Sequence, residues 1–111
     1  MDVIGPKKEN RDFRRVYARG RSYVSPSLVT YVLKNRNAAL RVGITTGKKV
    51  GNAVKRSRSR RVIREAYRQA YPRLKKGYDV VFVARGRTPF VKSTEVYRAM
   101  MKHFRDAGVL Q

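Results

Sequence analysis

Hydrophobic residues recur with a helical period in three segments of the chain. In the first segment, Phe13, Val16 and Tyr17 lie at i, i+3 and i+4 and therefore share one face. Asn52 is a plausible N-cap for the second segment, and Gly108 stands where a C-cap would end the third. The three predicted helices cover residues 9–20, about 53–72 and 93–108.

Other segments have the composition and pattern of β-strands. Residues 28–33 and 39–46 are rich in β-branched side chains and flank a turn-like segment at 35–37, so we expect them to pair as an antiparallel hairpin. Residues 78–84 form an apolar run, which predicts a central strand that is buried on both faces. A short strand at residues 22–24 is a further candidate.

Together these segments give the order αβ(β)βαβα, which predicts an α+β fold, an α/β sandwich. A chain of 111 residues can bury one core and is too short for two. We therefore expect one domain over residues 1–111, with its core at about 7–108. No apolar run approaches the roughly 18 to 20 residues of a membrane span, no signal-peptide pattern opens the chain, and cysteine is absent, so a cytoplasmic location is expected.

The charge of the chain identifies the kind of partner. Lys and Arg number 28 against seven Asp and Glu, which gives a formal net charge of +21. Repulsion of that size destabilises a compact state unless a polyanion or counterions neutralise it. Because 41% of the residues are hydrophobic, the chain can still form a core, unlike a basic disordered tail. A nucleic acid is the expected partner.

The densest positive charge lies at residues 48–64, where eight of seventeen residues are basic and none is acidic. On a helical wheel, the small and apolar side chains gather on one inward side: Ser59, Val62, Ile63, Ala66 and Ala70. The outward side holds Ser57, Arg60, Arg61, Arg64 and Arg68, with Arg56 and Arg58 at the rim. A merely solvated face normally alternates acidic and basic residues at i, i+4, whereas here like charges repeat at that spacing. The predicted nucleic-acid-binding residues are Lys48, Lys49, Asn52, Lys55, Arg56, Ser57, Arg58, Arg60, Arg61 and Arg64.

The residue types that catalysis by the polypeptide would need do not occur in a suitable pattern. Metal-dependent nucleases cluster carboxylates around cations, but among the seven acids only Glu9 and Asp12 are close in sequence. A two-histidine ribonuclease mechanism is excluded because His103 is the only histidine, and we expect His103 at the surface. No P-loop, GxGxxG or GxSxG pattern occurs. We predict a binding protein with no catalytic residue, metal ligand or cofactor of its own.

Residues 41–68, RVGITTGKKVGNAVKRSRSRRVIREAYR, closely resemble the signature of the bacterial ribonuclease P protein component. The segments DFRRVYARGRS, VTYVL and YDVVFVARG extend the resemblance to about residues 7–105. The sequence departs from the family at Ser57, where an asparagine usually stands between two arginines. Serine keeps a hydroxyl but lacks the paired donor and acceptor of an amide, so the RNA contact of that asparagine is open at this position.

The resemblance implies an αβββαβα fold like domain 2 of ribosomal protein S5, with a mostly antiparallel central sheet. It also implies a left-handed crossover through the basic helix, against the usual right-handed rule. In such an enzyme a large RNA subunit binds Mg²⁺ and cleaves, while one copy of the protein contacts that RNA and the 5′ leader of precursor tRNA. The leader would lie between the first helix and the sheet, on Phe13, Tyr17, Val29 and Tyr31, because aromatic rings can stack on unpaired bases. Neither a membrane nor an obligate protein partner is expected.

Some alternatives stay open at this point. The stripe of Phe13, Val16 and Tyr17 could simply be core, and Val16 is assigned there in any case. The whole protein could instead be a ribosomal or other structural RNA-binding protein with no role in tRNA processing. A protein-only nuclease is a further alternative, which the numbers of acids and histidines oppose.

Overall fold

The computed structural model describes residues 2–4, 10–36 and 38–111. Its strands are β1 (Asp2–Ile4), β2 (Arg21–Ser25), β3 (Leu28–Lys34), β4 (Arg41–Thr45) and β5 (Tyr78–Ala84). Its α-helices are α1 (Asn10–Arg19), α2 (Ala53–Ala70) and α3 (Ser93–Ala107). Short 3-10 helices are η1 (Lys48–Val50), η2 (Tyr71–Arg73) and η3 (Thr88–Phe90). The three α-helices and the strands β2 to β5 lie where the hydrophobic pattern predicts them.

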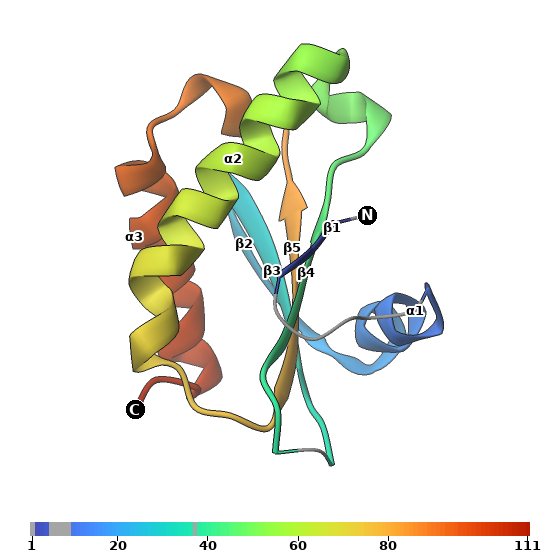
Figure 1. The fold of residues 1–111 in the computed structure, drawn as a ribbon, viewed down its shortest axis with the longest axis vertical. Coiled ribbons are helices and arrows are strands. Elements are labelled where there is room, and N and C mark those ends of the chain that lie inside the picture. Colours follow the sequence, from blue (N-terminus) through green and yellow to red (C-terminus); the bar gives the residue numbers. More distant parts are fainter. Residues whose placement is uncertain (1, 5–9, 37) are drawn as a thin grey trace.

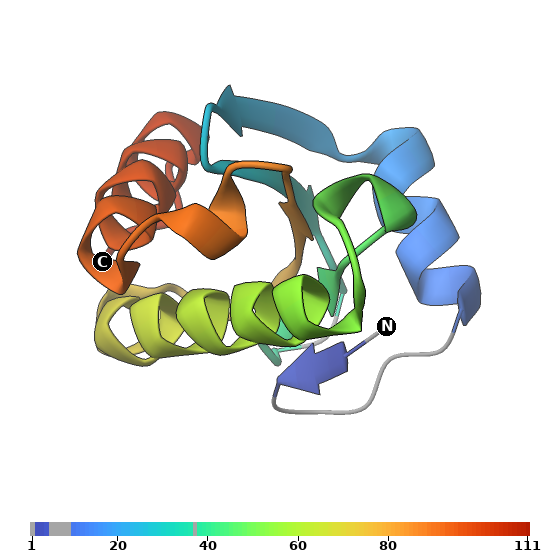
Figure 2. The same ribbon diagram turned by 90° about the horizontal axis from the view of Figure 1, so that it is seen from above.

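The described strands form one five-stranded sheet in the order β1-β4-β5-β3-β2. β4 and β5 run parallel, whereas the other neighbouring pairs are antiparallel. α2 and α3 cover one face of the sheet and α1 packs on the other (Figure 1; Figure 2). The connection from β4 through α2 to β5 is left-handed. The predicted α+β sandwich with a mostly antiparallel sheet is confirmed.

The predicted hairpin between residues 28–33 and 39–46 is wrong. β5 lies between β3 and β4 and pairs with both of them, antiparallel to β3 and parallel to β4. Phe82 faces α2 and α3, while Val81 faces α1, so β5 is buried on both sides. A strand that is apolar on both faces is stable at the centre of a covered sheet, and here it separates two strands that a short turn connects.

The strand β1 extends the sheet beyond β4 and was not predicted. It places Asp2 opposite Ile44 and Ile4 opposite Val42. Three residues are too few to show the alternating pattern on which strand prediction depends. The described order of elements is therefore βαβββαβα, with β1 at the edge of the sheet next to β4.

The main core lies between the sheet and the two helices α2 and α3. The inward side of α2 is buried as the wheel predicts: Ser59, Val62, Ile63, Ala66 and Ala70. Tyr67 is buried beside them, with its ring 5.8 Å from that of Phe82. Burial of this side turns the opposite, arginine-rich side of α2 toward solvent. None of the helices in the described ranges is long and apolar enough to cross a membrane.

His103 is buried, with 2% of its surface accessible, so its predicted surface position is wrong. α3 holds the ring against β2 and β3, where Nε2 lies 2.8 Å from Ser25 Oγ and Nδ1 lies 2.8 Å from Thr30 Oγ1. Ser25 and Thr30 precede His103 by 78 and 73 residues in the chain, so no local sequence pattern reveals these contacts. Burial lowers the pKa of His103 to about 4, and the ring is therefore neutral at neutral pH.

Mild acid is expected to destabilise the protein through His103. An unfolded histidine has a pKa of about 6.5, above the folded value, so the unfolded chain binds the proton first. The contribution of His103 is complete above about pH 6.5 and is lost progressively as the pH falls toward 4, by on the order of 1 to 3 kcal/mol. Urea unfolding between pH 7 and pH 5 should show this loss in the wild type and a shallower loss in His103→Gln. Equal slopes for the two proteins would contradict it.

Candidate nucleic-acid interface

The candidate interface begins at the turn that leads into α2. Gly51 has a φ of 130°, a conformation that favours glycine, and it redirects the chain from η1 into the helix. Asn52 caps α2, because its Oδ1 accepts a 3.0 Å hydrogen bond from the N–H of Lys55. Lys48 and Lys49 in η1 are exposed, as are Asn52 and Lys55. Two lysines therefore lie next to a helix amino end, where backbone amides also favour anions.

Along α2 the side chains that point to solvent form one stripe. The outer stripe is defined as Ser57, Arg61, Arg64 and Arg68, which follow one another at spacings of four, three and four residues. All four residues are exposed. A hollow of about 380 Å³ lies along the stripe and is also lined by Arg60 and Glu65. The outward orientation that the wheel predicts for these four residues is confirmed.

Arg60 departs from its predicted outward position. Its side chain is half-buried, and its Nη1 donates a 2.9 Å hydrogen bond to Thr46 Oγ1, one residue beyond the end of β4. The adjacent Thr45 Oγ1 lies 2.7 Å from the hydroxyl of Tyr17 in α1. The two threonines therefore connect the basic helix with α1 around the end of β4. Sequence reasoning missed this link, whose only signal is a pair of threonines at the end of a predicted strand.

Other basic side chains at the rim of α2 are held by uncharged groups. Arg58 donates from Nε to the carbonyl oxygen of Pro89 at 2.6 Å. The Nζ of Lys55 lies 5.2 Å from the centre of the Phe90 ring. Arg56 is half-buried. Contacts with a carbonyl and an aromatic ring orient Arg58 and Lys55 without neutralising their charge.

Positive charge dominates α2 in the folded protein. The helix carries seven basic residues and one acid, Glu65. Glu65 pairs with Arg68 at 3.4 Å, and both side chains are exposed, so the pair contributes little to stability. Like charges at i, i+4, such as Arg64 and Arg68, repel each other and destabilise the helix in the absence of an anion. A polyanion that lies along this side would remove the repulsion.

On the opposite face of the sheet, three of the four predicted leader-binding residues lie together. We call them the α1 face: Tyr17, Val29 and Tyr31. All three are half-buried. The rings of Tyr17 and Tyr31 meet edge to face with their centres 5.0 Å apart. Burial raises the pKa of Tyr17, so its hydroxyl stays protonated in the hydrogen bond with Thr45. The α1 face thus offers two partly accessible aromatic rings.

Phe13, the fourth predicted leader-binding residue, is buried with 2% of its surface accessible. It packs with Val16 and Val81 between α1 and β5, and Tyr17 and Tyr31 pack against this small cluster. A ring that is enclosed by the core has no free face on which a base could stack. Direct contact of Phe13 with the leader is therefore a wrong prediction, and the core alternative holds for this residue.

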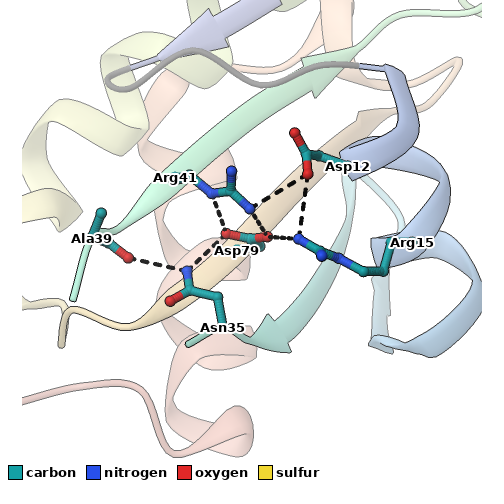
Figure 3. Close-up of polar contacts among 6 residues, drawn as sticks. All are labelled: Asp12, Arg15, Asn35, Ala39, Arg41 and Asp79. Carbon is teal, nitrogen blue, oxygen red and sulfur yellow. Dashed lines mark hydrogen bonds and ion pairs between the residues drawn. The ribbon is translucent and has the colours of Figure 1, made fainter. Parts of the chain in front are cut away.

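A network of ion pairs fixes α1 against the sheet (Figure 3). Asp79 of β5 is fully buried and accepts hydrogen bonds from Arg41, at 2.8 Å from Nε and 2.7 Å from Nη2. Asn35 donates to the same carboxylate at 2.8 Å, and Arg15 of α1 approaches it at 3.4 Å. Asp12 lies 3.3 Å from Arg15 and 3.6 Å from Arg41. These contacts join α1, β4, β5 and the turn after β3.

Carboxylates are not arranged for metal binding in the part of the chain that the structure describes. Within it, no three histidine, aspartate or glutamate side chains gather as a possible metal site. Asp12 and Asp79 approach each other, but arginine side chains lie between them. Glu9, which the sequence places near Asp12, lies outside the described residues.

Comparisons with known proteins give a consistent result. A family model described as Ribonuclease P matches residues 8–108. The ribonuclease P protein component of Clostridium beijerinckii is 44% identical over 109 residues, which cover 92% of this chain and 87% of that protein. The protein of the same description from Clostridioides difficile is 51% identical over 79 residues, which cover 70% of this chain and 69% of that protein.

Solved structures are similar over nearly the whole chain. The RNase P protein of Staphylococcus aureus matches with a TM-score of 0.80 at 28% identity, covering 95% of this chain and 96% of that one. The RNase P protein of Thermotoga maritima matches with a TM-score of 0.76 at 25% identity, covering 89% of this chain and 94% of that one. The similarity therefore includes both α1 and the basic helix α2.

Proposed function

The chain belongs to the ribonuclease P protein component family, and we propose that it is the RNA-binding, non-catalytic subunit of a ribonucleoprotein that removes 5′ leaders from precursor tRNA. The observation that carries the proposal is the outer stripe of α2, which presents arginines to solvent along one side of a helix with a single acid. The α1 face, on the other side of the sheet, supplies a separate surface for single-stranded RNA.

The α2 side of the protein is proposed to bind the catalytic RNA with one protein per RNA. Lys48, Lys49 and Asn52 would hold phosphates at the helix start, and the outer stripe would hold them along the helix. Arginine suits this role because its planar guanidinium makes paired hydrogen bonds to phosphate and stacks on bases. Binding would release counterions, so affinity should fall steeply as salt rises. At Ser57 a hydroxyl remains available for a hydrogen bond to RNA.

The α1 face is proposed to hold the leader. Tyr17 and Tyr31 offer partly accessible rings, and base stacking on such rings is tolerant of sequence. Val29 adds an apolar contact beside them. The link from Tyr17 through Thr45 and Thr46 to Arg60 would keep the two RNA-binding surfaces in a fixed relation, which favours simultaneous binding of catalytic RNA and substrate.

Catalysis is assigned to the RNA subunit, with Mg²⁺ held there and no cofactor bound by the protein itself. Asp79 and Asp12, which approach each other in the protein, are engaged by arginines that would repel a cation. The contribution proposed for the polypeptide is to neutralise phosphates and hold the leader, which lowers the concentration of divalent ions that the assembled enzyme requires. A cytoplasmic location stays a prediction from the sequence.

Reconstitution tests the proposed function. The purified protein is added to the ribonuclease P RNA of Clostridium beijerinckii and a precursor tRNA, and cleavage is followed at low magnesium. We expect the protein to stimulate release of the leader under conditions where the RNA alone is slow, and to cleave nothing by itself. Absence of stimulation would favour the ribosomal or structural RNA-binding alternative, whereas cleavage without RNA would favour a protein-only nuclease.

Tyr31→Ala is expected to weaken binding of precursor tRNA to the assembled enzyme. Loss of one stacked base costs about 1 to 3 kcal/mol, so the dissociation constant should rise on the order of tenfold. Mature tRNA lacks the leader and should bind nearly as tightly as it does to the wild-type enzyme. Tyr31→Phe is the matched control and should retain affinity because it keeps the ring. Equal losses for precursor and mature tRNA would argue against leader binding by the α1 face.

A further inference from the structure

Another hollow, of about 740 Å³, opens where α2 ends. It lies between η2, residues 38–40 before β4, and Gln111. Its larger apolar side chains are Leu40, Tyr67, Tyr71 and Leu74, and the basic residues that line it are Arg64, Arg68 and Lys76. The volume falls within the range of about 300 to 1,000 Å³ that is typical of sites for small molecules. It could therefore hold a single nucleotide.

Tyr71 continues the outer stripe of α2 by one more step. It follows Arg68 by three residues, which preserves the alternating spacing of the stripe. The other residues of the stripe are polar, whereas Tyr71 is an aromatic residue with 54% of its surface exposed. Its ring centre lies 5.9 Å from that of Tyr67, at an angle of 56°, so the two rings form a corner instead of a closed stack. Tyr71 thus presents an aromatic surface at the end of a row of arginines.

The charge around the hollow matches an anionic ligand. Arg64 and Arg68 line both this hollow and the one along the outer stripe, so the two hollows are adjacent. Lys76 adds a third basic residue on the side of the loop that leads to β5. Among the described residues, no acidic side chain lines the larger hollow; Glu65, which pairs with Arg68 at 3.4 Å, lines only the smaller one, and both side chains of that pair are exposed. Apolar and aromatic walls beside basic side chains fit a ligand with a flat ring and a phosphate.

We propose that this hollow binds an unpaired nucleotide of the RNA that lies along α2. The base would lie against Tyr71, while Arg64, Arg68 and Lys76 would hold the flanking phosphates. This inference rests on the proposed function and deepens it, because it names a single-stranded nucleotide as the ligand at the carboxyl end of the helix. Stacking on an aromatic ring tolerates any base, so the site selects an unstacked nucleotide and not a sequence.

Substitution of Tyr71 tests the proposal with ribonuclease P RNA of Clostridium beijerinckii as the probe. Tyr71→Ala should raise the dissociation constant on the order of tenfold, because one stacked base is lost. The slope of log affinity against log salt should stay unchanged, since no phosphate contact is removed. Tyr71→Phe should bind like the wild type, whereas Tyr71→Leu should resemble Tyr71→Ala because an aliphatic side chain cannot stack. Thermal unfolding of each variant verifies that the exposed position tolerates the change.

Val24→Ala is the matched control, since Val24 is a 64% exposed apolar residue on β2, at the opposite edge of the sheet from β1. It should leave RNA affinity unchanged. Wild-type affinity in Tyr71→Ala, together with weak binding by Arg61→Ala, would overturn the nucleotide site and leave the proposed function standing. Full binding by Tyr71→Leu would also overturn it, because the contact would then be apolar without stacking. Failure of the wild-type protein itself to bind this RNA would overturn the proposed function and the nucleotide site together.

Discussion

Replacement of Arg61, Arg64 and Arg68 together with alanine is expected to weaken binding to the ribonuclease P RNA by at least roughly 100-fold at physiological salt. Each hydrogen bond from a guanidinium to a phosphate contributes about 1.5 to 3 kcal/mol, and the three arginines share one exposed stripe. The slope of log affinity against log salt should also fall by about 2 to 3, since each lost phosphate contact removes about 0.7 to 0.9. Filter binding over a series of salt concentrations measures both quantities.

The matched control removes the same charge from a different helix. Arg98, Lys102 and Arg105 are exposed on α3 at spacings of four and three residues, so replacing them with alanine also lowers the net charge of +21 by three. This variant should keep most of the RNA affinity. Equal losses for the two triple variants would mean that total charge, and not the outer stripe of α2, governs binding. The unfolding free energy of both variants should stay within about 1 kcal/mol of the wild type, because the substituted side chains are exposed.

Asp79→Asn is expected to lower the unfolding free energy by about 3 to 5 kcal/mol, because it leaves the mostly buried Arg41 with only the more distant carboxylate of Asp12, at 3.6 Å. Asp79 accepts from both Arg41 and Asn35, and hydrogen bonds to Asp79 raise the pKa of Arg41, so the guanidinium remains charged. An asparagine offers one acceptor oxygen and adds two donors of its own, so it cannot satisfy these partners. The melting temperature should fall by about 15 °C or more, as measured by circular dichroism.

Asp106→Asn is the control for Asp79→Asn, since Asp106 is an exposed carboxylate on α3. Its effect should stay within about 0.5 kcal/mol. A double-mutant cycle with Arg41→Ala sharpens the test. If the ion pair carries the effect, the double variant should lose much less stability than the two single losses added together. Additive losses would show that Asp79 acts through other contacts.

Elements with a strong hydrophobic period were predictable from the sequence, whereas their pairing was not. α2, α3 and β5 each show a pattern over at least seven residues, and each lies where it was expected. The hairpin prediction was wrong because the turn after β3 is compatible both with direct pairing of β3 and β4 and with the insertion of β5 between them. The burial of β5 on both faces favours the insertion. The left-handed crossover came from the resemblance, since periodicity carries no information about handedness.

In the candidate interface too, positions that follow from the helical period were predictable, whereas positions that depend on tertiary packing were not. The position of the outer stripe follows from the position of the apolar side chains of α2, so a helical wheel correctly identifies Arg61 and Arg64 as exposed. Phe13 and Tyr17 share a helical face in the sequence, yet packing encloses one ring and leaves the other partly open. The position of Arg60 depends on Thr46, which a helical wheel does not include.

The central strand of the sheet is also the last strand in the chain, which has a consequence for synthesis. While the ribosome is still making the residues before Tyr78, β3 and β4 each lack the neighbour that joins them in the finished sheet. Their open backbone edges can pair with other strands during this interval. The nascent chain closes its sheet only after β5 emerges, and α3 then completes the cover on one face. β3 and β4 therefore stay without their shared neighbour until the residues of β5, Tyr78–Ala84, have been translated.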